Sequence, residues 1–252
     1  MPSASHERLQ REAAFHDRAF ADGTRQSTRR FYDVARSSKA AYTRQVLAGC
    51  AGQAVLEYGC GPGSCAPDLL AAGATVTGID ISPEAIALAA RAAGGGERLR
   101  LEVMDAEALA FPAASFDRVC GSGILHHLEL TRALPEVARV LKPGGRAAFF
   151  EPLGHNPLIA LYRRCTPGLR TADERPLRAA DLRYIAGHFH RARFAYHHLA
   201  ALLAAPLWGR PGFEAARRIL GLVDVALLTV PLLRRQAWIV TMDLAAPRPP
   251  AG

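Results

Sequence analysis

Between residues 53 and 150, short apolar runs alternate with stretches in which apolar residues recur at helical spacing. The second helical stretch carries end signals, with Ser82 as N-cap, Pro83 in the first turn and glycines after residue 93. The pattern predicts strands at 54–58, 74–79, 99–104, 116–120 and 146–150, and helices at 67–72, 83–93 and 131–141. This alternation requires a parallel sheet with helices on both faces, so the predicted fold class is a doubly wound α/β sheet.

Outside this region the pattern differs. Residues 1–50 are predicted to be helical, with a buried side made by Phe15, Phe20, Phe31, Tyr32 and Tyr42. After Glu151 the pattern predicts helices at 157–164 and 177–188, a strand at 192–197, apolar helices at 199–233 and a last strand at 237–244. The predicted division is an N-terminal helical cap (1–50), a core (51–152), an arginine-rich segment returning to the sheet (153–198), an apolar insertion (199–235), the last strand (236–246) and a disordered tail (247–252).

The composition limits what the chain can be. With 252 residues, 50% hydrophobic and 21% charged, it is expected to fold as one large unit rather than stay disordered. The apolar run at 219–233 is interrupted by Asp224 and Pro231, so no membrane-spanning helix is predicted. Charged residues at 7, 8, 11 and 12 stand where a signal peptide would be apolar. The five cysteines form no CxxC pair and are expected to be reduced thiols of a cytoplasmic protein.

The net charge of +8 raises the question of a nucleic-acid partner. Lys39 and Lys142 are the only lysines, and arginine together with heavy alanine usage is typical of a GC-rich genome, so no nucleic acid is expected to bind. Eight arginines and three acidic residues lie between 161 and 193. The simpler interpretation is a solvated surface, and the alternative is a grip on an anionic acceptor such as a carboxylate or a prenyl diphosphate.

The strongest local signal for chemistry is VLEYGCGPGS at 55–64, where a buried strand leads into a glycine-rich turn before a helix. Gly59, Gly61 and Gly63 allow a sharp turn and let a ligand lie against the backbone, near the free N–H groups of the helix. Their GxGxG spacing differs from the GxGxxG of dinucleotide-binding proteins, which argues against a nicotinamide-dependent oxidoreductase.

Further signals follow at strand ends on the same predicted edge of the sheet. Asp80 ends the second strand, where a carboxylate can accept both hydroxyl groups of a ribose. Asp105 and Ala106 follow the third strand, where they can meet the edge of an adenine. The fourth strand leads into Gly121-Ser122 and the sequence ILHHL at 124–128, and KPGG at 142–145 precedes the fifth strand.

As a set, these motifs resemble those of class I S-adenosylmethionine-dependent methyltransferases, in particular the small-molecule branch that includes quinone methylases. The resemblance covers about residues 40–152 and the strand at 237–244. It implies a seven-stranded, mostly parallel Rossmann-like sheet with an antiparallel last strand and S-adenosylmethionine over the carboxyl ends of the strands. It implies as cofactor-binding residues Glu57, Gly59, Gly61 and Gly63 near the methionine portion, Asp80 on the ribose, Ile81 against adenine, Asp105 and Ala106 at the adenine rim, and Ser122 beside the methionine amino group.

Transfer of a sulfonium methyl group needs mainly positioning, but an O–H or N–H acceptor also needs a base. His127, and after it His126, is the candidate catalytic base because both follow the fourth strand; simple packing is the alternative role. Tyr32 and His155 are weaker candidates for the substrate pocket, as is His16. No metal is expected, because the histidines at 188, 190, 197 and 198 lack a cysteine pair or a carboxylate at ligand spacing.

The apolar stretch at 199–233 is an addition to the sheet that the resemblance implies. Two helices this apolar are expected to be buried nearly all round, as core, as a homodimer interface or as a lid over a lipophilic acceptor. Arginine pairs at 217–218 and 234–235 also suit a peripheral contact with a membrane. The lid interpretation predicts that Trp208 or Phe213 lines the acceptor pocket.

The predicted function is methylation, in the first place O-methylation, of a hydrophobic small molecule of specialised metabolism. One alternative is C-methylation of a prenyl diphosphate or quinone-like acceptor held by the arginine-rich segment. A second alternative, of another class, is a non-catalytic partner subunit that binds S-adenosylmethionine. A nucleic-acid methyltransferase is disfavoured, because 199–233 is too apolar for a nucleic-acid surface and no aromatic-proline tetrapeptide follows the fourth strand.

Overall fold

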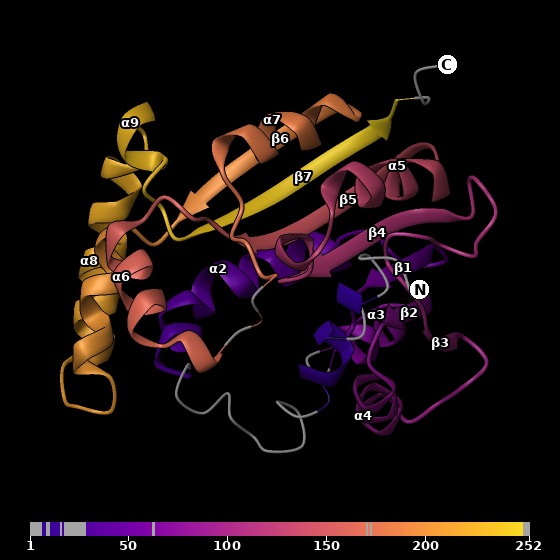
Figure 1. The fold of residues 1–252 in the computed structure, drawn as a ribbon, viewed down its shortest axis with the longest axis horizontal. Helices are drawn as coiled ribbons and strands as arrows, with labels where there is room; N and C mark the ends of the chain where they lie inside the picture. The colour runs from indigo at the N-terminus through magenta and orange to yellow at the C-terminus, as the bar shows by residue number, and fades with distance from the viewer. Residues whose placement is uncertain are drawn as a thin grey trace.

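A seven-stranded sheet forms the centre of the molecule, with the strand order β3-β2-β1-β4-β5-β7-β6 (Figure 1). The computed structural model describes residues 7–8, 11–15, 17, 29–61, 64–169, 171 and 173–248. The strands are β1 (Ala54–Tyr58), β2 (Thr75–Asp80), β3 (Leu99–Val103), β4 (Phe116–Ser122), β5 (Leu141–Pro152), β6 (Phe189–His197) and β7 (Ile239–Pro247). Strands β1 to β5 pair in parallel, and β7 is antiparallel to both of its neighbours. The predicted fold class and the antiparallel last strand are confirmed.

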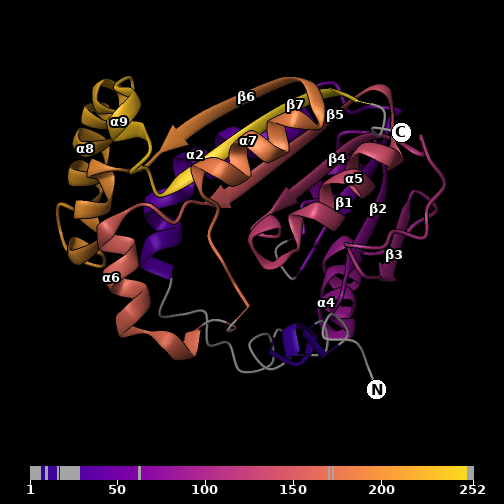
Figure 2. The same cartoon turned by 45° about the horizontal axis from the view of Figure 1, so that its top comes forward.

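Helices cover both faces of this sheet. They are α2 (Arg29–Leu47), α3 (Ala66–Ala71), α4 (Pro83–Ala93), α5 (Leu130–Val140), α6 (Pro157–Cys165) and α7 (Ala179–Gly187), with short 3-10 turns η2 (Leu125–His127) and η3 (Pro167–Leu169). Helices α5 and α7 contribute to one buried cluster, and α2 and α3 to a second. Figure 2 shows α5 and α7 in front of the sheet and α2 behind it. Neighbouring residues of β1 divide between the two clusters, since Leu56 and Tyr58 belong to the first cluster and Val55 to the second.

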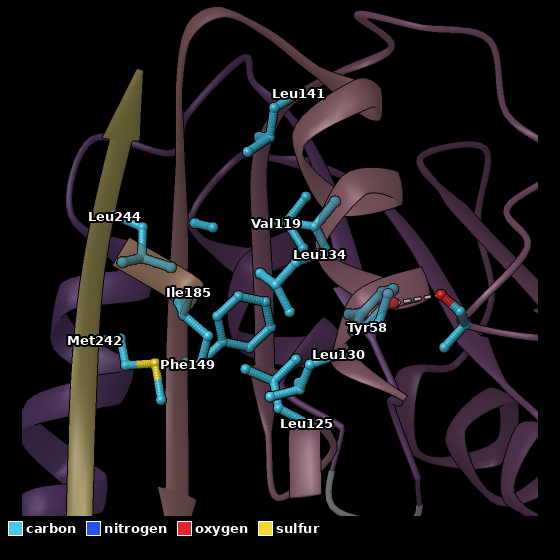
Figure 3. Packing of buried hydrophobic residues seen from close by; sticks show 14 of the residues in the cluster. Tyr58, Val119, Leu125, Leu130, Leu134, Leu141, Phe149, Ile185, Met242 and Leu244 are labelled. Carbon is cyan, nitrogen blue, oxygen red and sulfur yellow. Dashed lines mark hydrogen bonds between the residues drawn. The ribbon is translucent and has the colours of Figure 1, made fainter. Parts of the chain in front are cut away.

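The first cluster is the larger core (Figure 3). Phe149 of β5 lies at its centre, with Leu125 and Leu134 beside it and Met242 of β7 on the other side. The Tyr58 ring is buried here, and its hydroxyl donates to the carbonyl of Ala106. The buried tyrosine therefore ties the end of β1 to the loop after β3.

Helix α2 agrees with the helix predicted in the N-terminal segment, but one aromatic residue predicted on its buried side is exposed. Tyr42 is buried, and Phe31 packs on Tyr162 with ring centroids 4.6 Å apart. Tyr32 was expected on the buried side but is 58% exposed, because it follows Phe31 by one position and so projects about 100° away around the helix. Phe20, His16 and most of residues 1–28 lie outside the described residues.

The apolar insertion forms η4 (Ala200–Leu207), α8 (Phe213–Leu227) and α9 (Pro231–Arg234), with α8 packed on η4 and η4 on α2. Within a single chain these helices are not buried nearly all round, so the core interpretation does not account for all of their apolar side chains. Six large side chains after residue 218 are between 42% and 72% exposed: Ile219, Leu222, Val223, Val225, Val230 and Leu232. In a single chain these side chains remain exposed to solvent because η4 covers only one side of α8. Within the described residues, no helix combines the length and the apolar character that crossing a bilayer requires.

The last strand extends further than the pattern predicted. Strand β7 ends at Pro247, and the backbone N–H of Arg248 donates to the carbonyl of His188 at 2.8 Å. Residues 247 and 248, which were assigned to a disordered tail, are therefore paired with the start of β6. Residues 249–252 lie outside the described residues.

Candidate active site

The glycine turn after β1 brings the backbone against the carboxylate at the end of β2. Gly59 and Gly61 have φ values of +69° and +50°, a left-handed conformation that favours glycine. A Cβ at residue 59 would lie 2.7 Å from Ile124, so no larger residue fits there without a shift. The N–H of Gly61 donates to Oδ2 of Asp80 at 2.9 Å, and the N–H of Ser82 donates to Oδ1 at 3.0 Å. Each Asp80 oxygen still has acceptor capacity for one more hydrogen bond. Gly63 lies outside the described residues.

Glu57 fixes the start of α3 beneath this turn. Its carboxylate accepts hydrogen bonds from the backbone N–H of Cys65 at 2.6 Å and from the hydroxyl of Ser64 at 2.5 Å. Burial raises the pKa of Glu57, while these hydrogen bonds and Lys39 act in the opposite direction. Glu57 thus holds the start of α3, which follows the glycine turn, through hydrogen bonds.

Lys39 of α2 is a charged residue of this site that the sequence analysis missed. Its Nζ donates to the hydroxyl of Ser122 at 2.5 Å and lies 4.9 Å and 5.3 Å from the ring centroids of Tyr42 and Phe150. Burial lowers the pKa of Lys39, and Glu57 counteracts part of that shift. The sequence feature that could have pointed to Lys39 is its residue type, since it is one of two lysines in a chain that otherwise uses arginine.

The predicted adenine-side residues lie after β2 and β3. Ile81 directly follows β2 and is half-buried. The carboxylate of Asp105 accepts the backbone N–H of Glu107 at 2.8 Å, which stabilises the turn after β3. Ala106 is buried, and its carbonyl accepts the Tyr58 hydroxyl. Because β1, β2 and β3 are parallel neighbours, these residues and Asp80 share the carboxyl edge of the sheet.

The two candidate catalytic histidines stand side by side in η2, with ring centroids 4.2 Å apart. Nδ1 of His126 lies 2.7 Å from Oε2 of Glu151, whose other oxygen accepts the backbone N–H groups of Ile124 and Leu125 at 2.9 Å each. Nδ1 of His127 lies 3.1 Å from Oε2 of Glu12. Burial lowers the pKa of His127, and the neighbouring His126 lowers it further. Each imidazole is therefore oriented by its own carboxylate, a pairing that the sequence pattern did not indicate.

A third carboxylate, Glu174, approaches the histidine pair. One ligand atom from each of His126, His127 and Glu174 lies within 4.8 Å of the others, which is close enough for a metal ion. Arg163 donates to Glu174 at 2.5 Å, and the histidines bond other carboxylates. Because a guanidinium already compensates the Glu174 charge, a cation bound by these three side chains would compete with Arg163 for that carboxylate.

The structure does not bring the four residues predicted for the substrate pocket together in one pocket: Trp208 and Phe213 lie against α2, which carries Tyr32, and His155 lies apart at the start of α7. Tyr32 is exposed, and His155 accepts the backbone N–H of Ala179 at the start of α7. Trp208 is 41% exposed, and its indole N–H donates to Asp33 of α2 at 2.6 Å. Phe213 is buried in a small cluster formed by η4, α8 and α2. The structure thus gives Trp208 and Phe213 packing contacts between the insertion and α2.

The arginines of the 161–193 segment are also spread apart. Arg163 pairs with Glu174, and Arg175 pairs with Asp181 at 3.0 Å. Arg183 on α7 and Arg191 on β6 are exposed on different elements. Within the described residues, this segment presents paired and surface arginines rather than one cluster that would hold a diphosphate.

The comparisons with known proteins agree with this geometry. Residues 56–149 match the family model described as a methyltransferase domain. The chain is 41% identical over 108 residues to aklanonic acid methyltransferase DauC of Streptomyces sp. (strain C5), covering 40% of this chain and 49% of that protein. It is 35% identical over 123 residues to demethylmenaquinone methyltransferase of Clavibacter sepedonicus, covering 48% of this chain and 49% of that protein. The chain thus spans about half the length of these curated relatives.

The structure of Haemonchus contortus phosphoethanolamine N-methyltransferase 2 in complex with S-adenosyl-L-methionine resembles this fold. The TM-score is 0.60 at 20% identity, covering 83% of this chain and 52% of that chain. Residues 56–149 therefore match the methyltransferase-domain family, and the fold agrees with the class I S-adenosylmethionine-dependent methyltransferases that the motifs resemble, for which S-adenosylmethionine is the implied cofactor.

The described residues fit this cofactor. A Cβ at residue 61 would lie 3.8 Å from Oδ2 of Asp80, so glycine keeps open the space beside the carboxylate where ribose hydroxyl groups would bind. The Lys39 ammonium offers a partner for an anionic group at the other end of the turn, beside Ser122. The site thus offers the Asp80 carboxylate as an acceptor for hydroxyl groups and the Lys39 ammonium as a donor to a carboxylate.

Proposed function

We propose that the chain is a methyltransferase that acts on a hydrophobic small molecule of specialised metabolism, with an oxygen atom as the acceptor. The observation that carries the methyltransferase part of this proposal is the Asp80 carboxylate, held by the N–H groups of Gly61 and Ser82 with acceptor capacity left over. In the proposed complex, Asp80 accepts the ribose hydroxyl groups, and the glycine turn supports the methionine portion. When bound, S-adenosylmethionine supplies an activated methyl group for direct displacement by the acceptor.

Lys39 is proposed to bind the carboxylate of the methionine portion. Its ammonium group is buried, bonded to Ser122 and attracted by Glu57. A carboxylate beside it would favour the charged form of Lys39 and offset the burial that lowers its pKa. Ile81, Asp105 and Ala106 are proposed to border the adenine, on the basis of their positions after β2 and β3.

His127 is proposed as the base that removes the acceptor's proton, with His126 as the second candidate. Because burial lowers its pKa, His127 is held in the neutral form that can accept a proton. The Glu12 carboxylate at Nδ1 would then stabilise the imidazolium that forms. His126 has the same arrangement with Glu151, and in the proposed reaction the second nitrogen of the catalytic ring accepts the proton.

The acceptor class draws its support from the names of the relatives and from the surface of the chain. Two relatives are named for aklanonic acid and for demethylmenaquinone, and both names denote methyltransferases. The alternative of a prenyl diphosphate held by the arginine-rich segment has weaker support, because Arg163 and Arg175 are paired with carboxylates. A cytoplasmic location is proposed from the five cysteines, which are all free thiols.

The cofactor assignment is tested by calorimetric titration with S-adenosylmethionine. Asp80→Ala is expected to weaken binding about ten- to a hundredfold, since it removes a charge-assisted hydrogen bond of about 1.5–3 kcal/mol. The matched control is Asp243→Ala, which removes a carboxylate that pairs with Arg146. Unchanged affinity in a folded Asp80→Ala protein would refute the assignment.

The catalytic assignment is tested by following S-adenosylhomocysteine release with a panel of phenolic polyketides and quinols. With the acceptor found there, His127→Ala is expected to lower turnover by about two to four orders of magnitude without changing cofactor affinity. His190→Ala, on the exposed part of β6, is the matched control. Full turnover in both the His127→Ala and His126→Ala proteins would reject a histidine base. Cofactor binding without turnover of any acceptor would favour the non-catalytic partner subunit.

A further inference from the structure

Helix α8 exposes apolar side chains on the side turned away from the protein. We define the outer apolar face as Ile219, Leu222, Val223 and Val225 of α8 together with Val230 and Leu232, which follow it. Residues 219, 222 and 225 are spaced three apart, and residue 223 is four after 219. These four side chains therefore form one apolar stripe along the helix. A contiguous exposed stripe of this kind marks an interaction site more often than single exposed residues do.

The orientation of α8 is fixed by its inner side. The buried Asp224 accepts the backbone N–H groups of Leu199, Ala200 and Ala201 at 3.2, 2.5 and 3.2 Å. Phe213, at the start of α8, is buried against Val34 of α2 and residues of η4. Rotating the helix to bury the outer apolar face would break the three hydrogen bonds and bring Phe213 to the surface. The apolar stripe is therefore held toward the outside by the fold.

The charges around the outer apolar face are basic. Arg210 and Arg218 are exposed before it, and Arg234 and Arg235 are exposed after it. Of the two acidic residues in the insertion, Asp224 is buried and Glu214 bonds Arg36 and Arg217 at 3.0 and 2.8 Å. Two copies of this chain meeting across a twofold axis would bring like charges together, whereas anionic lipid headgroups complement them.

A second element extends this end of the molecule. Helix α6 lies beside α8 in both views (Figures 1 and 2), and its Leu158 and Leu161 are 49% and 60% exposed. Arg164 on the same helix is exposed as well. The combination of apolar side chains with arginines thus recurs on two neighbouring helices. Because no described helix can cross a bilayer, these helices could only lie at its surface.

We propose that the outer apolar face docks on an anionic membrane surface. The apolar side chains enter the boundary between headgroups and acyl chains, and the four arginines contact lipid phosphates. The inference rests on the surface of the insertion alone and not on the methyltransferase reaction. Its occupant is a lipid surface, and a second copy of the chain is the outcome that the experiment must exclude.

The test uses the full chain in co-sedimentation with vesicles of phosphatidylcholine alone and of phosphatidylcholine with 30% phosphatidylglycerol. The protein is expected to bind the anionic vesicles and to lose binding in 0.5 M NaCl. Leu222→Ser/Val225→Ser is expected to weaken binding at least tenfold. Arg234→Gln/Arg235→Gln is expected to weaken it about 25-fold, from roughly fivefold per arginine.

Two control variants remove matching groups from the opposite edge of the sheet. Val103→Ser changes an apolar side chain that is 53% exposed on β3, and Arg91→Gln/Arg100→Gln removes two exposed positive charges. Both controls are expected to bind like the unchanged protein. Absence of sedimentation with anionic vesicles would overturn the proposal, as would equal losses in the controls. A dimer in light scattering that Leu222→Ser/Val225→Ser dissociates would assign the face to self-association instead.

Discussion

Helices α5 and α8 are both amphipathic, but they place their apolar sides in opposite directions. In α5 the apolar residues Leu130, Leu134 and Val137 are buried in the main core, and Arg132 points outward (Figure 3). In α8 the buried residues include the charged Asp224, while Leu222 and Val225 are among the most exposed large apolar side chains of the described residues. The comparison teaches that an apolar stripe predicts an interface, but not whether the partner belongs to the same chain.

The largest expected difference between the two helices is in stability. Leu134→Ala in α5 removes a fully buried side chain and should lower the free energy of unfolding by about 2–5 kcal/mol. Leu222→Ala in α8 should change it by less than about 0.5 kcal/mol, since that side chain is 72% exposed. Urea denaturation measures both values. A large loss in the Leu222→Ala protein would show that α8 is buried in solution and would remove the contrast.

The next largest expected effect on stability comes from Asp224, which holds α8 against η4. Asp224→Ala leaves three backbone N–H groups at the start of η4 without their acceptor, and we expect a loss of about 2–3 kcal/mol. Amide exchange should become faster in η4 and α8 while α5 keeps its protection. Glu214→Ala at the other end of α8 is the control, because its pairs with Arg36 and Arg217 are at the surface. Equal loss of protection in α5 would mean that the insertion and the core unfold together.

The two regions also differ in how far the sequence could predict them. The alternation between 53 and 150 specifies that β1 to β5 exist because each strand and helix has a local period and local end signals, as Ser82 and Pro83 show. The start of β5 was predicted wrongly, since the strand begins at Leu141 and includes the KPGG sequence that was expected to precede it. The cofactor edge follows from the alternation, since parallel strands place Asp80 and Asp105 at one edge. The burial of α8 depends on which side η4 covers, and the Lys39–Ser122 bond joins residues 83 positions apart. Neither the packing of η4 on α8 nor the Lys39–Ser122 bond produces a local pattern in the sequence.

The glutamate partners of the histidines illustrate the same limit. His126 and His127 were predicted as candidates because they follow β4. Glu151 comes to His126 from the end of β5, and Glu12 comes to His127 from 115 positions earlier in the chain. A one-sequence pattern identifies the strand ends but not which side chains meet there. The position of the histidines at the end of β4 was thus predictable, and their hydrogen-bond partners were not.

Acidification should destabilise the joint between β6 and η4. His198 is buried beside Ser38, with Nε2 2.7 Å from its hydroxyl, and burial lowers the pKa of His198 to about 3. Below pH 6.5 the unfolded chain binds a proton that folded His198 does not, so stability falls as the pH falls. The expected loss is about 2 kcal/mol at pH 5, measured by thermal unfolding at pH 7, 6 and 5.

The variant His198→Asn isolates this contribution. Asparagine tolerates the φ of +63° at this position and does not titrate. The slope of stability against pH should become shallower in this variant. It should not vanish, because burial also lowers the pKa values of His127 and His197. An unchanged slope would place the acid sensitivity elsewhere.

The smallest expected effect tests whether the insertion is a lid or a support. Trp208 was predicted to line the acceptor pocket, and in the structure its indole N–H bonds Asp33 at the surface of α2. Trp208→Phe removes that donor but keeps an aromatic ring, and it should cost about 1 kcal/mol of stability with an unchanged KM for the acceptor. Trp208→Ala should add only a small further loss, because the side chain is 41% exposed. A changed KM or acceptor size preference in Trp208→Ala alone would restore the lid interpretation, since only the loss of the ring would then matter.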